Sequence, residues 1–128
     1  MSEPIWIPRE MIVAIHLRQL AEHGGGAGVR DEGLLESALQ RPINKLAYGS
    51  PDLADLAAAY AYGIARNHPF IDGNKRTALI ASFTFLYVNG LRMTSTQENN
   101  VLCFLALAAG ERSEDELAAW FRQNSSPL

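Results

Sequence analysis

The chain has 128 residues, which fits a single domain over residues 1–128 and allows a core to form without disulfides or a structural metal. Its 48% hydrophobic and 20% charged residues match ordinary globular proteins and exclude a disordered or fibrous chain. A formal net charge of -3 excludes the broad basic surface of a general nucleic-acid binder, so any anion site must be local.

The first part of the chain is predicted to form two amphipathic helices. Pro8 suits the first turn of a helix, which Gly24 to Gly26 should end near His23. Asp31 is a favourable N-cap for the second helix. Pro42 is expected to end that helix, because proline lacks a backbone donor and clashes with the preceding turn.

The middle of the chain is predicted to contain a flap followed by two long helices. Residues 41–51 show no helical period and are interrupted by proline and glycine, which favours an extended flap or small hairpin. Asp52 then caps a helix that should end near Asn67. The next helix begins near Asn74 and is apolar on nearly every side to Val88, so we predict that it is the buried central helix.

Two further helices are predicted towards the C-terminus, before a tail at 124–128 that is expected to fray. Ser95 with Glu98, and Ser113 with Glu116, have the spacing of capping boxes. In total, about six helical segments with short connections and no repeat predict an all-α bundle with a small flap before its central helices.

No segment has the pattern of a secretion signal or a membrane span. The longest apolar stretch, residues 78–88, is too short to cross a bilayer, so we expect a cytoplasmic protein without membrane or direct nucleic-acid partners. The single cysteine, Cys103, lies in an apolar run and is expected to be buried. His16 and His23 are expected on a helix surface, without metal-ligand spacing to His68.

The segment NHPFIDGNKRTA, residues 67–78, is the candidate site. The proline after His68 disfavours helical geometry, so this histidine should begin a loop, where its imidazole can accept a proton from an attacking hydroxyl. Asp72 supplies one carboxylate, and one carboxylate with substrate phosphates and water is a common way to hold Mg²⁺.

The start of the following helix is predicted to bind phosphate, because its unpaired N–H groups attract anions. Gly73 permits a sharp turn and close backbone approach, and Asn74 can cap the helix. Lys75 brings a movable charge, and Arg76 brings a planar fork for phosphate oxygens. Each cation there costs roughly 0.3–1 kcal/mol unless an anion offsets it, which favours a bound anion.

The stretch HPFIDGNKRTA resembles the signature of the Fic/Doc family, and its GNKRTA ending is similar to the death-on-curing (Doc) branch. The segments GVRDEGLLESALQRP, LAAAYAYGIARNHPF and FTFLYVNG resemble the same branch, so the likeness covers about residues 15–121. It implies that His68 is the base, that Asp72 holds Mg²⁺, and that residues 73–76 bind phosphate. Residues 41–48 match the family's flap, which orients the target chain by strand addition.

Three positions bear on the reaction that this resemblance implies. Many adenylyl-transferring members have a second glycine in place of Lys75 and an arginine in place of Leu79. Doc-like toxins share the lysine and phosphorylate a hydroxyl of elongation factor Tu, which requires the γ-phosphate to face His68. Doc has alanine in place of Gly73, so the orientation of the nucleotide stays open.

The resemblance therefore predicts a toxin of a type II toxin–antitoxin system. It would use ATP and Mg²⁺ to phosphorylate a Ser or Thr of a translation factor such as elongation factor Tu, and a cognate antitoxin would be its partner. Adenylyl transfer to a protein hydroxyl and a catalytically silent helical binding module stay open as alternatives. Thr94, Glu98 and Asn99 formally match the family's inhibitory pattern, but the capping role of Ser95 and Glu98 and the shortness of the pattern argue against an inhibitory helix.

Overall fold

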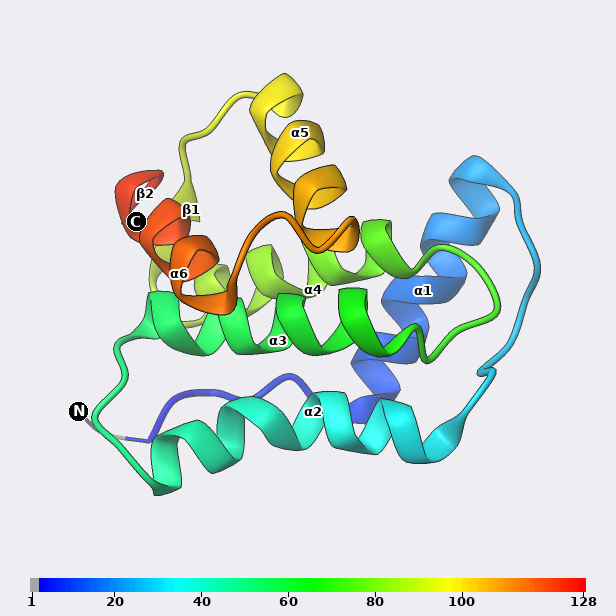
Figure 1. Ribbon diagram of the computed structural model, residues 1–128, viewed down its shortest axis with the longest axis horizontal. Coiled ribbons are helices and arrows are strands. Elements are labelled where there is room, and N and C mark those ends of the chain that lie inside the picture. The colour runs from blue at the N-terminus through cyan, green and yellow to red at the C-terminus, as the bar shows by residue number, and fades with distance from the viewer. Residues whose placement is uncertain (1–2) are drawn as a thin grey trace.

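Six helices and a small two-stranded sheet make up the computed structural model, which describes residues 3–128 (Figure 1). The helices are α1 Arg9–His23, α2 Glu32–Ala47, α3 Leu53–Asn67, α4 Asn74–Val88, α5 Gln97–Ala108 and α6 Glu114–Gln123. The strands are β1 Leu91–Met93 and β2 Ser125–Pro127. The predicted all-α bundle is confirmed. Within residues 3–128, no helix has the length and apolar character that a membrane span requires.

The central helix is α3, so the expectation that α4 is central was wrong. Every residue from Leu56 to Ala61 is buried, and α3 contacts α2, α4, α5 and α6 (Figure 1). Small side chains allow this: a Cβ on Gly63 would lie only 3.1 Å from Ala38 Cα of α2. Although α4 is also apolar, it leaves Tyr87 61% exposed.

The predicted flap at residues 41–51 is wrong for most of its length, because α2 continues through Pro42 to Ala47. Pro42 is buried on the same face of α2 as Leu35 and Ala38, so the helix continues its packing against α3 beyond the proline. Tertiary contacts thus stabilise a helix that the local proline signal disfavours.

The C-terminal tail, which was expected to fray, instead forms β2 and pairs antiparallel with β1. Its register places Leu91 opposite Pro127 and Met93 opposite Ser125. The predicted cap of α5 also shifts by one residue: Thr96 accepts a hydrogen bond from the Asn99 N–H. The tail ordering could not be read from its composition, because strand pairing depends on a distant partner.

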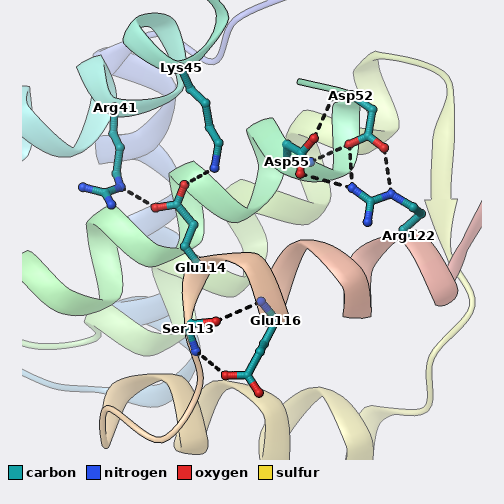
Figure 2. Close-up of polar contacts among 8 residues, drawn as sticks. All are labelled: Arg41, Lys45, Asp52, Asp55, Ser113, Glu114, Glu116 and Arg122. Carbon is teal, nitrogen blue, oxygen red and sulfur yellow. Dashed lines mark hydrogen bonds and ion pairs between the residues drawn. The ribbon is translucent and has the colours of Figure 1, made fainter. Parts of the chain in front are cut away.

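An ion-pair cluster joins α2 to the start of α6 (Figure 2). The Glu114 carboxylate, with only 14% of its side chain exposed, accepts a hydrogen bond from Arg41 at 2.6 Å and another from Lys45. This cluster is intermediate between an exposed ion pair and a fully buried one. We therefore expect Glu114→Ala to lower the free energy of unfolding by about 1–2 kcal/mol. Urea unfolding measures this change. The control is Asp115→Ala, because Asp115 is exposed in the same first turn of α6 and its removal also loses a favourable charge at the helix N-terminus.

A second ion pair predicts an acid-sensitive contribution to stability. Arg122 donates hydrogen bonds to Asp52 at 2.7 and 3.1 Å and lowers the pKa of that carboxyl to about 2, from 3.8 (Figure 2). This contribution is complete above about pH 4 and is lost as pH falls through about 2. Since both side chains are about half exposed, the contribution of this ion pair to the free energy of unfolding should stay below about 1 kcal/mol. The free energy of unfolding of Arg122→Gln should be lower than that of the wild type above about pH 4, and this difference should shrink as the pH falls towards 2.

Candidate active site

His68 lies where α3 ends, with its side chain exposed. Its backbone is left-handed, with φ 50 and ψ 57, which confirms that it leaves helical geometry at this point. Arg30 stabilises this conformation from a separate loop: its Nε donates to the His68 carbonyl at 2.8 Å and its Nη2 donates to the Asn67 carbonyl at 3.0 Å. A left-handed histidine is thus stabilised by contacts outside its own helix.

The loop that carries Arg30 also pairs with the backbone that follows His68. The Arg30 N–H donates to the Pro69 carbonyl at 2.7 Å, and the Ile71 N–H donates to the Gly28 carbonyl at 3.1 Å. These bonds surround an antiparallel bridge between Val29 and Phe70. The α1–α2 and α3–α4 loops therefore lie together at one end of α3 (Figure 1).

Asn74 is the first residue of α4, but it does not cap the helix as predicted, since the N-cap residue is Gly73. Its buried amide spans the loop: Oδ1 accepts from the Phe70 N–H and Nδ2 donates to the Phe70 carbonyl, both at 3.0 Å. Nδ2 also lies 3.4 Å from His68 Nδ1. Asn74 therefore links the shape of the loop to the position of the histidine ring.

His16 contradicts the expectation of a surface histidine, because it is only 1% exposed. Its ring stacks on Phe70 with centroids 3.9 Å apart, and its Nε2 lies 2.8 Å from the Asp72 carbonyl oxygen. Because a carbonyl only accepts hydrogen bonds, Nε2 must carry the proton. His16 of α1 thus anchors the loop at both Phe70 and Asp72.

The Asp72 side chain is exposed and has one carboxylate oxygen engaged by the loop itself. Its Oδ1 accepts from the Gly73 N–H at 2.7 Å. A Cβ on Gly25 would lie 2.5 Å from Oδ2, so the glycine allows the α1–α2 loop to approach the carboxylate closely. Within residues 3–128, no three His, Cys, Asp or Glu side chains are grouped to hold a metal ion, so a cation here needs further ligands from a substrate.

The start of α4 has the features of an anion site. Gly73 adopts φ 76 as the N-cap residue, and the structure of residues 3–128 shows no side chain capping this helix. Lys75 is exposed, and Arg76 is partly buried with its Nε buried and without a hydrogen-bond partner among the described residues. The Arg76 Nη2 approaches Gly73, lying 3.6 Å from the position of a Cβ there. Two cations thus flank uncapped N–H groups.

All six predicted site residues lie in this one loop and helix start: His68, Asp72, Gly73, Asn74, Lys75 and Arg76. Sequence reasoning did not identify Arg30, His16 and Gly25 as parts of the site. The glycine run was interpreted only as a helix stop, although three consecutive glycines also suit a close backbone approach. No local pattern could have paired Arg30 and His16 with the loop, because they lie 38 and 56 residues from their partners.

Cys103 lies outside this site. The cysteine is buried as predicted, and burial raises the pKa of its thiol. A raised pKa reduces the thiolate fraction at neutral pH, so Cys103 is a poor nucleophile.

Comparison with known proteins extends the likeness beyond the loop. The sequence profile of the Fic/DOC family matches residues 6–86. Toxin Doc from Mycolicibacterium smegmatis is 48% identical over 75 residues, covering 56% of this chain and 57% of that protein. Protein kinase doc from Escherichia phage P1 is 34% identical over 118 residues, covering 91% of this chain and 93% of that protein. The chain therefore aligns with little more than half of the first relative and with nearly all of the second.

Proposed function

Because the chain belongs to the Fic/DOC family, we propose that it is a toxin that transfers the γ-phosphate of ATP to a Ser or Thr hydroxyl of a protein. The observation that carries this proposal is the single loop that places an exposed histidine before an uncapped, cationic helix start. The relatives named Toxin Doc and Protein kinase doc support the same reading.

In the proposed reaction, His68 takes the proton of the target hydroxyl as that oxygen bonds to the γ-phosphorus. The bond from the γ-phosphorus to the β–γ bridging oxygen breaks, and ADP leaves. The backbone N–H groups at Gly73 to Arg76, with Lys75 and Arg76, bind the phosphates. Binding the phosphates beside His68 would lower the entropic cost of bringing the hydroxyl and the γ-phosphorus together.

The carboxylate of Asp72 fits a magnesium ion that arrives with the nucleotide. Its Oδ1 is engaged by Gly73, whereas no side chain or backbone donor of residues 3–128 bonds to Oδ2. Mg²⁺ bound there would neutralise charge on the phosphates. The buried Arg76 Nε, which has no partner in the described chain, fits an anionic ligand at the same place.

The expected biological partners follow from the proposed toxin function. We propose a cognate antitoxin protein as the restraining partner, in a type II toxin–antitoxin system. Elongation factor Tu is the proposed target, so that phosphorylation inhibits translation in the cytoplasm. Adenylyl transfer is the second candidate reaction, because the same cradle would accept ATP in the opposite orientation.

The test is to incubate the purified chain with Mg²⁺, elongation factor Tu and ATP labelled at either the α- or the γ-phosphate. Phosphate transfer predicts label from γ-labelled ATP only, an added mass of one phosphate, and complete loss of labelling with EDTA. Label from α-labelled ATP would establish AMP transfer instead. The same incubation is repeated with a cell extract in place of elongation factor Tu. No label on any protein of that extract would favour the silent binding module.

A further inference from the structure

His16 is a polar residue on the buried face of α1, a helix that packs against α4. Ile12, one turn earlier on the same face, is apolar and equally buried. An imidazole at such a position takes polar nitrogens out of water, which costs free energy unless a hydrogen bond replaces those lost. A phenylalanine would supply the same stacking on Phe70, where the two ring planes are 11° apart. The hydrogen bond between Nε2 and the Asp72 carbonyl is therefore the contact that packing alone does not explain.

The carbonyl that His16 contacts belongs to the peptide unit between Asp72 and Gly73. This peptide is trans, as are all those described in residues 3–128, so its C=O and N–H point to opposite sides. The N–H of the same unit, on Gly73, donates to Asp72 Oδ1 at 2.7 Å. One peptide plane is thus held from both sides, by the His16 ring at its carbonyl and by the Asp72 carboxylate at its N–H.

We propose that His16 is a positioning residue for the Asp72 carboxylate as a magnesium ligand, acting through this peptide unit. The inference rests on the proposed function, in which Asp72 binds Mg²⁺ that arrives with the nucleotide. His16 fixes the carbonyl, the rigid peptide plane fixes the direction of the Gly73 N–H, and that N–H holds Oδ1. Oδ2 accepts no hydrogen bond within residues 3–128, so it is the oxygen left to bind the cation.

This arrangement matters because the Asp72 side chain is exposed and would otherwise lose rotamer freedom on binding a cation. Groups that orient a metal ligand from outside typically change the metal affinity by about 10–100-fold. Here the orienting group acts one step further out, through the backbone. The ring also covers the turn itself, since a Cβ on Gly73 would lie 3.7 Å from His16 Cδ2. The donor and the ring of His16 are thus two contributions that substitutions can separate.

Two substitutions make this separation. His16→Phe keeps an aromatic ring against Phe70 but cannot donate to the Asp72 carbonyl. His16→Gln loses the ring but keeps a donor, because its amide nitrogen is as many bonds from Cβ as Nε2 is. Gln19→Met is the matched control on α1: it also replaces a buried polar side chain, whereas the contacts to the loop come from His16.

The first measurement is calorimetry of a non-hydrolysable ATP analogue with each full-length variant, in Mg²⁺ and in EDTA. The wild type should bind more tightly in Mg²⁺. His16→Phe should reduce this Mg²⁺-dependent gain about 10-fold and change the affinity in EDTA less than about 2-fold, because the cradle at residues 73–76 is retained. His16→Gln should recover part of the gain, and Gln19→Met should match the wild type.

The second measurement needs no ligand. Amide exchange followed by NMR reports the hydrogen bond of the Gly73 N–H, and His16→Phe should accelerate this exchange roughly 3–10-fold, the usual effect of one lost hydrogen bond. His16→Gln should lie between His16→Phe and the wild type. Unchanged exchange in His16→Phe would overturn the proposal.

A purely structural role for His16 predicts a different pattern. His16→Phe would then keep the Mg²⁺-dependent gain, or lose affinity equally in Mg²⁺ and EDTA, and either result overturns the proposal. If His16→Phe does not fold, His16→Gln decides, since loss of its gain with a folded chain contradicts a role for the donor. Failure of the wild type to bind the analogue in either condition would instead refute the proposed function, and the Gly73 exchange would still test how His16 holds the peptide.

Discussion

Replacing His68 by alanine is expected to reduce protein phosphorylation by about 10²–10⁴-fold, the usual contribution of a positioned general base. Nothing in the cradle changes, so the KM for ATP should stay close to wild type. The side chain is exposed at the end of α3, so the substitution removes little packing and should leave the unfolding temperature nearly unchanged. The loss of phosphorylation is measured by labelling with γ-labelled ATP. Its effect in cells is measured by growth after expression without antitoxin.

The matched control for this prediction is His23→Ala at the end of α1. His23 is also exposed, at 50% of its side chain, and lies outside the loop, so its loss should leave both labelling and growth arrest unchanged. Growth arrest by His68→Ala equal to that of the wild type would contradict the enzymatic account and favour the silent binding module.

The sequence predicted the loop well because its features are local. Proline after His68 and glycine before Asn74 restrict their own backbone neighbours, so the end of α3 and the start of α4 follow from adjacent residues. The same local reasoning failed at Pro42, where contacts with α3 and α6 extend the helix beyond the expected break. Local signals set helix ends here only where no distant partner opposes them.

The parts of the site that the sequence missed all depend on distant contacts. His16 reads as one polar residue on an amphipathic helix, and only the folded chain places its ring on Phe70. Burial of α4 was overestimated for a related reason. Apolar residues on every side indicate a buried helix only if partners cover every side, whereas Tyr87 and Val88 of α4 are 61% and 37% exposed.

Replacing Arg30 by alanine is the second large effect that we expect. The substitution removes both hydrogen bonds that hold the carbonyls of Asn67 and His68, and a left-handed histidine is unfavourable without such support. A base displaced by about 1 Å can lower the rate about 100-fold, so kcat should fall by roughly 10–100-fold. The KM for ATP should change little, because Arg30 makes no hydrogen bond to residues 73–76.

The comparison of kcat with KM separates positioning from general damage to the fold. Arg30→Lys can still donate to one of the two carbonyls and should recover part of the lost kcat. Arg18→Ala removes an exposed arginine of α1 that donates its hydrogen bond to Glu22 and not to the loop, so it should match the wild type. A fall in kcat that tracks loss of unfolding temperature across these variants would assign Arg30 a structural role only. A fall in kcat without such loss requires that Arg30 acts by positioning His68.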